Sequence, residues 1–213
     1  MVRYQPEHKQ ETRRRLVDSA VTTLRRDGVA NAGLKEIMQS LGMTVGGFYR
    51  HFPSKSALVQ AAVEEGLNQS LERMQEASTD DPAASIVRFA KRYLSQAHRE
   101  SLADGCVLAA LASDIARAES EVKQACQAGL HEVRGQMLEH LPDDADVAEK
   151  LWGLIALEMG GLLLSRMVDD DATADEILGS CRQSVAALLQ ANDDAAAAPK
   201  RRVAKRAKSE NAS

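Results

Sequence analysis

The side chains best suited to binding a polyanion lie together in one short stretch, GMTVGGFYRHFPSK, from Gly42 to Lys55. Thr44 and Tyr49 carry hydroxyl groups and Lys55 carries a cation, and all three can bond to phosphate oxygens. The stretch also holds three of the seven aromatic residues of the chain. These aromatic residues follow two glycines, which is an unusual combination for a helix. The flanking sequence indicates the reason for it.

Apolar periodicity predicts helices on both sides of this stretch. The first helix begins near Glu7 or Gln10, and Asp27-Gly28 ends it with a left-handed cap. Its apolar stripe consists of Leu16, Val17, Ala20, Val21 and Leu24. A second helix of about two turns has its apolar positions at i, i+3, i+4 and i+7, namely Leu34, Ile37, Met38 and Leu41. Gly42 then permits a sharp turn, and Thr44 caps a third helix.

The third helix has two different faces. Phe48 and Phe52 are four residues apart and point inward, whereas Tyr49 lies on another face. Gly46 and Gly47 would let the helix start approach a groove closely. Helix, tight turn and exposed polar helix together are the pattern of a helix-turn-helix reader of DNA. The alternative is an ordinary short helix that is packed by two phenylalanines, with Gly-Gly marking a loop.

The rest of the chain predicts an all-α protein, because it is rich in Ala, Leu, Glu, Arg and Gln and shows no strand pattern. Ser54 caps a fourth helix that runs to about Ala77, and a further helix follows Pro82. Later helices are expected at residues 104–117, 120–141, 143–168 and 173–191, with a turn at Pro142-Asp143-Asp144.

The charge is distributed unevenly along the chain. Residues 1–60 have a balance of +5, residues 61–198 of −14 and residues 199–213 of +5, within a net charge of −4. Only the ends of the chain are therefore expected to face a polyanion.

Cysteine usage and apolar patterning predict a cytoplasmic protein. Three widely spaced cysteines without a CxxC argue against a disulfide framework and a zinc site. The N-terminus has no apolar signal core, and the run Leu151–Leu164 is too short to span a membrane and contains Glu158. No metal, cofactor or membrane partner is expected.

Residues 10–60 resemble the N-terminal domain of the TetR/AcrR family of transcriptional regulators. The resemblance is carried by Leu16, Ala20, Gly28, Ile37, Leu41-Gly42-Met43 and above all the run from Gly46 to Leu58. It implies that Lys35 to Phe52 form the helix-turn-helix. The positions that it assigns to DNA are Thr44, Val45, Gly46, Tyr49, Arg50, His51 and Lys55. Lys35 and Gly47 are further DNA-binding candidates. Gly33 departs from the family, which usually has Ser or Thr there to cap the second helix.

The resemblance beyond residue 80 is looser and is carried by Gly105-Cys106, Ala109–Ala112 and Gly161–Arg166. It implies a helical regulatory domain that dimerises through its last two long helices and encloses an inducer pocket. We therefore expect a DNA-binding domain at 9–69, a regulatory and dimerisation domain at 70–192 and a disordered basic tail at 193–213. Two copies would match a palindromic operator.

Three residues of the second domain are candidates for sensing a ligand. Cys106 lies near a helix start, where amides and the helix dipole can activate a thiol, although Asp104 opposes this and packing is the alternative. Glu158 needs a partner in its apolar helix, either in an inducer, across a dimer or within the bundle. Trp152 could line a pocket or lie in the core.

These features predict a homodimeric transcriptional regulator, most simply a repressor, that a small molecule or thiol modification releases from operator DNA. An activator, a helical-bundle enzyme and a protein-binding adaptor are the alternatives. No nucleophile–base set, phosphate loop or metal-ligand cluster supports an enzyme. The basic tail could either add non-specific DNA affinity or be neutral.

Overall fold

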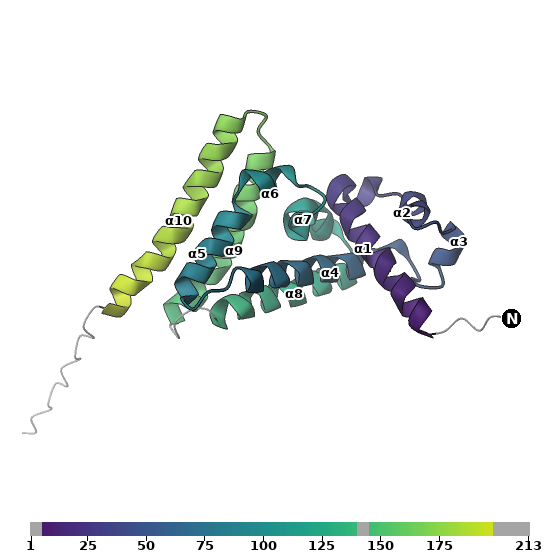
Figure 1. Cartoon of the computed structure of the whole chain (residues 1–213), viewed down its shortest axis with the longest axis horizontal. Helices are drawn as coiled ribbons and strands as arrows, with labels where there is room; N and C mark the ends of the chain where they lie inside the picture. The colour runs from purple at the N-terminus through teal and green to yellow at the C-terminus, as the bar shows by residue number, and fades with distance from the viewer. Residues whose placement is uncertain (1–5, 140–144, 198–213) are drawn as a thin grey trace, which may run out of the picture.

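The structure is a computed structural model that describes residues 6–139 and 145–197, and these residues form helices and connecting loops without any strand (Figure 1). The helices are α1 (Pro6–Asn31), α2 (Leu34–Ser40), α3 (Val45–Phe48), α4 (Lys55–Glu76), α5 (Pro82–Tyr93), α6 (Gln96–Glu100), α7 (Val107–Arg117), α8 (Ser120–Glu139), α9 (Ala145–Arg166) and α10 (Asp171–Ala197). The predicted all-α architecture, with a helix-turn-helix unit followed by a helical bundle, is confirmed.

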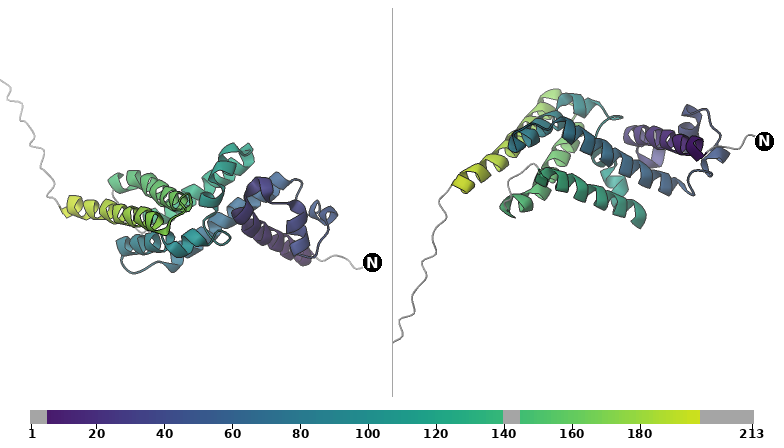
Figure 2. Two further views of the ribbon diagram at one scale, coloured as in Figure 1. Left: turned by 90° about the horizontal axis from the view of Figure 1, so that it is seen from above. Right: turned by 60° about the horizontal axis from the view of Figure 1, so that its bottom comes forward.

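The first three helices form one end of the molecule, and α10 lies at the other end (Figures 1 and 2). The predicted apolar stripe of α1 is buried, with Leu16, Ala20 and Leu24 almost completely inaccessible to solvent. Gly28 does adopt a positive φ of 75°, but its ψ of 169° is extended, so the expected left-handed helical cap is wrong. The chain kinks there and makes one further helical turn as far as Asn31.

Helix α4 joins the two parts of the molecule. Ser54 caps it as predicted by accepting a hydrogen bond from the Ala57 amide at 3.1 Å. It packs against α1 on one side and against α7 and α8 further along. One hydrophobic core therefore continues from the α1–α3 unit into α7 and α8. The expected domain boundary at 69/70 falls inside this single helix.

A second core, formed by the end of α4 with α5, α8, α9 and α10, completes the bundle. The short helix α6 was not predicted; Ser95 caps it by accepting from the His98 amide at 3.2 Å. Helix α10 extends to Ala197, beyond its expected end at 191. The predicted turn at 142–144 and most of the basic tail lie outside the described residues.

None of the described helices has the length and apolar character needed to cross a bilayer.

Candidate nucleic-acid interface and effector cavity

The turn between α2 and α3 has the geometry that the sequence predicts. Gly42 adopts a φ of 68°, which an L-residue with a side chain rarely tolerates. Thr44 is the N-cap residue of α3, but its side chain makes no capping hydrogen bond. Its hydroxyl is therefore not used by the helix.

The two phenylalanines hold α3 and the following turn to the body of the domain. Phe48 and Phe52 are buried, and their rings stack with centroids 5.8 Å apart. The guanidinium of Arg13, on α1, lies 4.6 Å from the centre of the Phe52 ring. Tyr49, in contrast, is 63% exposed. The predicted inward and outward faces are thus both present, although α3 ends at Phe48 and both Tyr49 and Phe52 follow it in the turn.

The outer edge of this element is open. A Cβ atom on Gly46 would have only the Thr44 hydroxyl oxygen within 4 Å, at 4.0 Å, and one on Gly47 would approach no atom closer than 3.7 Å. Neither packing within the chain nor backbone conformation therefore requires glycine at these positions. Of the residues predicted to contact DNA, Lys35, Thr44, Val45, Gly46, Tyr49 and Arg50 are exposed, while Gly47, His51 and Lys55 are half-buried.

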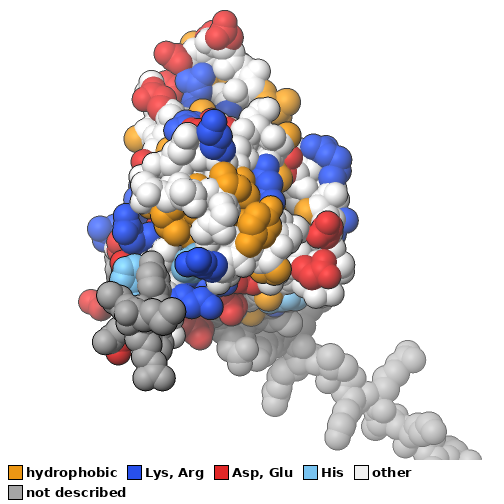
Figure 3. All heavy atoms as spheres, turned by 90° about the vertical axis from the view of Figure 1, so that its right-hand side faces the viewer, with side chains coloured by type: hydrophobic (Ala, Val, Ile, Leu, Met, Phe, Trp, Pro, Cys, Tyr) orange, Lys and Arg blue, Asp and Glu red, His pale blue; other side chains and the backbone are white. Residues whose placement is uncertain are grey.

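Cations surround this edge. The pKa of His51 is lowered by burial and by the nearby charges of Lys9, Arg13 and Arg50. The Nδ1 atom of His51 is buried without a hydrogen-bond partner. Figure 3 shows this end of the molecule, where basic side chains, with acidic ones among them toward the rim, lie around a central area of uncharged and hydrophobic atoms. This arrangement suits a ligand that is anionic at its edges.

Lys55 takes part in an internal contact. Its Nζ atom donates to the Val29 carbonyl at 2.6 Å, so one of its three donors is used inside the chain. The Val29 amide donates to Oδ2 of Asp114, on α7, at 3.2 Å. The single turn after the kink at Gly28 is therefore held from both sides, by the start of α4 and by α7.

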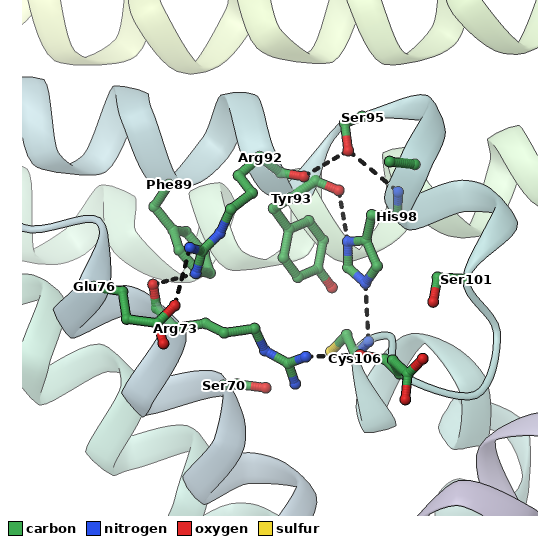
Figure 4. A pocket seen from close by; sticks show the side chains of 12 residues that line it. Ser70, Arg73, Glu76, Phe89, Arg92, Tyr93, Ser95, His98, Ser101 and Cys106 are labelled. Carbon is green, nitrogen blue, oxygen red and sulfur yellow. Dashed lines mark hydrogen bonds and ion pairs between the residues drawn. The ribbon is translucent and has the colours of Figure 1, made fainter.

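A cavity of about 330 Å³ lies in the bundle between α4, α5, α6 and the start of α7 (Figure 4). Its wall includes apolar Phe89 and Tyr93 together with Arg73, His98 and Cys106. This volume is in the usual range for a small-molecule site. Of the three sensor candidates predicted from the sequence, Cys106 lines this cavity.

His98 fixes the position of Cys106. Its Nδ1 atom lies 2.7 Å from the Tyr93 carbonyl, to which it donates, and its Nε2 atom accepts from the Cys106 amide at 2.9 Å. Burial, opposed by the hydrogen bond to Tyr93 and aided by nearby arginines, lowers the pKa of His98 to about 4. The ring is therefore neutral at pH 7, as this pair of hydrogen bonds requires.

The Cys106 thiol faces the Tyr93 hydroxyl, and burial and then Cys106 raise the pKa of that phenol. Cys106 itself is 6% exposed and is the N-cap residue of α7. The predicted position near a helix start is thus confirmed, with the sulfur in the cavity wall (Figure 4). Cys126 is buried and Cys181 half-buried, both as free thiols.

Glu158 and Trp152 do not line this cavity. Glu158 is 4% exposed, and its Oε1 atom has no partner in the described part of the chain, so the partner expected from sequence is not found there. Burial raises its pKa to about 8. Trp152 is 41% exposed, so the core alternative is wrong, and it lines a separate hollow of about 240 Å³ together with His131. Its ring contacts His131 edge-on at 5.6 Å and lies beneath Arg134.

Sequence reasoning missed three of the polar residues that line the cavity, namely Arg73, Tyr93 and His98. Each lies on a helix that also carries many exposed polar residues, so its type and spacing do not distinguish it. Ser95 offered the one usable signal, because a serine three residues before His98 could have indicated the start of α6.

Helices α2 and α3, with the turn at Gly42 and the exposed edge of α3, form a helix-turn-helix. Residues 16–62 match the sequence model described as bacterial regulatory proteins, tetR family. This N-terminal segment is therefore a domain of the TetR type.

Two curated relatives, both from Pseudomonas putida, are the HTH-type transcriptional regulator TtgR and the probable HTH-type transcriptional regulator ArpR. Each is 31% identical over 104 residues, which cover 49% of this chain and 49% of the relative. The alignment thus spans about half the length of these proteins.

Two solved structures share the fold over most of their length. A TetR transcriptional regulator from Chloroflexus aurantiacus has a TM-score of 0.71 at 24% identity, over 86% of this chain and 96% of that one. The reduced form of Escherichia coli NemR has a TM-score of 0.70 at 20% identity, over 82% and 95% of the two chains.

Proposed function

We propose that this protein is a homodimeric transcriptional repressor that binds palindromic operator DNA and is released by a small molecule or by modification of Cys106. The observation that carries the DNA-binding role is the contrast within α3 and the turn after it. Two buried phenylalanines fix its inner face, while Tyr49 and two glycines that nothing inside the chain requires lie outside. Because glycines have no side chain, this surface leaves room for the DNA backbone to approach closely.

The individual contacts follow from chemistry and exposure. Residues 44–47 and Arg50 would meet base edges in the major groove, since the start of a recognition helix enters it. Tyr49 and Lys55 would bind phosphates, Lys55 with the donors that Val29 leaves free. Lys35 is exposed on α2 and would also bind a phosphate. The positive charges near His51 would attract DNA phosphates to this edge.

An unpartnered face on α9 supports the homodimer. Exposed or half-exposed small and apolar residues recur along one side of this helix and just past its end: Trp152, Gly153, Ala156, Gly160, Leu164 and Met167. A Cβ atom on Gly153 or Gly160 would meet nothing within 4 Å. Gly161, in contrast, already packs against Cys181 of α10. A second copy on this face would give two recognition elements for a two-fold operator.

The cavity and the Val29 contacts support an effector response. Cys106, in the cavity wall, begins α7, and Asp114, on the same helix, bonds to Val29 at the kink of α1. A ligand or an adduct at Cys106 that moved α7 would therefore act on the α1–α4 contact. We assign no enzymatic reaction to the cavity, whose role is to bind the signal.

Sequencing of the genomic DNA fragments that the purified protein retains tests the DNA-binding role. We expect one enriched palindromic sequence, and at least tenfold weaker binding to it by Arg50→Gln, because a bidentate base contact contributes about 1–3 kcal/mol. Arg88→Gln, at an exposed arginine on α5, is the matched control and should bind as the wild type does. Retention without sequence enrichment, or an unaffected Arg50→Gln, would contradict the assignment.

Replacement of Cys106 tests the thiol response. Cys106→Ser should bind the operator normally but should not be released by a thiol-reactive compound, whereas Cys126→Ser should respond as the wild type does. One of the similar structures is described as a reduced form, which supports testing the thiols of this chain. Release of the Cys106→Ser variant by the same compound would show that Cys106 is not the sensor.

A further inference from the structure

Two neighbouring arginines at the cavity have no carboxylate partner. Arg25, on α1, is 6% exposed, its Nε atom has no hydrogen-bond partner, and its Nη2 atom donates a long hydrogen bond to the Gly66 carbonyl at 3.4 Å. Arg73, on α4, donates from Nη1 to the Asp104 carbonyl at 2.6 Å, but its Nη2 atom is buried without a partner. In the described part of the chain neither guanidinium forms an ion pair within 4.0 Å.

The other arginines beside the cavity are satisfied, which makes these two unusual. Arg92 pairs with Glu76 at 3.2 Å, and Arg166 donates to the carbonyls of Arg99 and His98 at 3.1 and 2.7 Å. The unpaired N–H groups are therefore a local property of Arg25 and Arg73, and not of every cation in this region.

The positive charge of this pair is only weakly balanced. Burial, and then the charge of Arg73, lower the pKa of Arg25 to about 10, so it remains protonated at pH 7. The carboxylates of Asp104 and Glu65 act on it from further away, Asp104 from an exposed position and Glu65 from a half-buried one. A buried charge without a close counter-charge is costly, and proteins usually satisfy such groups.

The pair lies where two cavities meet. Arg73 lines the 330 Å³ cavity with Phe89 and Tyr93, and it also lines an adjoining cavity of about 220 Å³ with Arg25. Figure 4 shows the Arg73 side chain reaching from α4 toward Cys106, beneath the ring of Tyr93. An anionic group bound here would touch Arg73 with Arg25 behind it, while an apolar body would rest on the two aromatic rings.

We infer that this cavity takes a small aromatic carboxylate, with its carboxylate on Arg73 and Arg25 and its ring against Phe89 and Tyr93. A guanidinium matches the two oxygens of a carboxylate, and binding would supply the counter-charge that the folded chain lacks. The inference rests on the proposed effector role of the cavity and adds the chemical class of the effector.

Calorimetric titration of the full chain with benzoate and cinnamate, and with the neutral benzamide and cinnamamide, tests the inference. We expect the carboxylates to bind at least tenfold more tightly than the amides. Arg73→Gln should weaken carboxylate binding by about tenfold or more, since hydrogen bonds to charged groups contribute about 1.5–3 kcal/mol. Arg73→Lys should keep part of the affinity, and Arg88→Gln should keep all of it. Equal binding of amides and carboxylates, an unaffected Arg73→Gln, or no carboxylate binding at millimolar concentration would each overturn the inference.

A second variant tests the missing counter-charge without any ligand. Arg25→Met should raise the Tm of the unliganded protein by about 2–4 °C, because an apolar side chain replaces an uncompensated buried charge. The carboxylates should then stabilise this variant less than they stabilise the wild type. A Tm lowered by a similar amount would show that the chain itself satisfies Arg25, and would overturn the inference.

DNA release is measured separately, so that the two proposals fail differently. A carboxylate that binds at Arg73 but leaves the operator complex intact would remove the effector role and keep the anion site. Release by the neutral amides alone would keep the effector role and remove the anion site.

Discussion

The polar groups of the recognition stretch, from Thr44 to Lys55, and those of the cavity have opposite surroundings. Around Tyr49 and Arg50 the polar groups are exposed, and water satisfies them while no partner is bound. Around Cys106 the polar groups are buried, and the chain satisfies His98 completely but Arg73 only in part. The first surface leaves Nδ1 of His51 buried without a partner, whereas the second leaves buried guanidinium groups whose charge a ligand can balance.

The two sites also differ in how the chain assembles them. The recognition stretch is nearly continuous in sequence, from Thr44 to Lys55, and a few buried rings orient it. The cavity and the smaller one that adjoins it are lined by α1, α4, α5, α6 and α7, so their shape depends on how those helices pack. A substitution in the first site should therefore separate folding from binding more cleanly than one in the second.

The largest expected effect concerns the two faces of the recognition element. Phe48→Ala should lower the free energy of unfolding by about 3–5 kcal/mol, because it empties a fully buried site in the core. Tyr49→Ala should change it by less than about 0.5 kcal/mol, because Tyr49 is largely exposed, yet it should weaken operator binding. Urea unfolding at one fixed protein concentration and operator titrations measure both quantities. Similar losses of stability in the two variants would remove the distinction between inner and outer ring.

The next effect concerns the buried carboxyl of Glu158. Its folded pKa of about 8 exceeds the ordinary 4.5, so the folded protein keeps a proton that the unfolded chain loses between these values. The contribution of Glu158 to the free energy of unfolding is therefore fully present below pH 4.5 and is lost as the pH rises to about 8. Glu158→Gln should remove this pH dependence and raise stability at pH 8 by on the order of 3 kcal/mol.

Unfolding midpoints across pH 5–9 measure the Glu158 effect. Glu176→Gln, at an exposed position on α10, is the control and should keep the wild-type profile. A flat wild-type profile, or the same profile in Glu158→Gln, would show that the buried carboxyl does not hold the proton.

A smaller effect concerns the contact between the two sites. Asp114→Ala should lower the free energy of unfolding by about 1 kcal/mol, because the Val29 amide loses its capping acceptor. It should also reduce the change in operator affinity that an effector produces, while Asp169→Ala, at an exposed position after α9, should change neither. The measurement is operator affinity with and without effector. An unchanged effector response would exclude this contact as the connection.

The smallest expected effect has opposite signs for folding and for binding. Gly46→Ala should stabilise the protein by about 0.5–1 kcal/mol, because alanine favours a helix and its Cβ atom has room. The same methyl group should weaken operator binding if this edge approaches DNA closely. Thermal unfolding and operator titration of the one variant measure both. Unchanged operator affinity would leave Gly46 without a role at the interface.

Several features could be predicted from the sequence because they depend on neighbouring residues. The turn at Gly42, the cap at Ser54 and the inward Phe48 and Phe52 follow from local conformational preferences and from helical spacing, and the structure confirms them. The extended ψ of Gly28 was not predictable, because the chain there is held by Asp114 and Lys55 from distant helices.

Residues of the bundle were harder to place, because their surroundings come from elsewhere in the chain. Trp152 is a residue type that is common in cores, but it lies on an outer face of α9. The sequence did not indicate this, since α9 is apolar almost throughout and no periodicity marks its buried side. Glu158 was expected to have a partner, but burial instead raises its pKa.

The sequence by itself determined the all-helical fold, the helix-turn-helix and the exposed position of Tyr49, because each of these depends on residues within one or two helical turns. Only the tertiary structure decided that Arg25 and Arg73 lie together at the cavity and that His98 holds the Cys106 amide. Arg25 and Arg73 are 48 residues apart in sequence, on α1 and α4. Their proximity, and the charge they leave uncompensated, result from how the helices pack and not from any local preference.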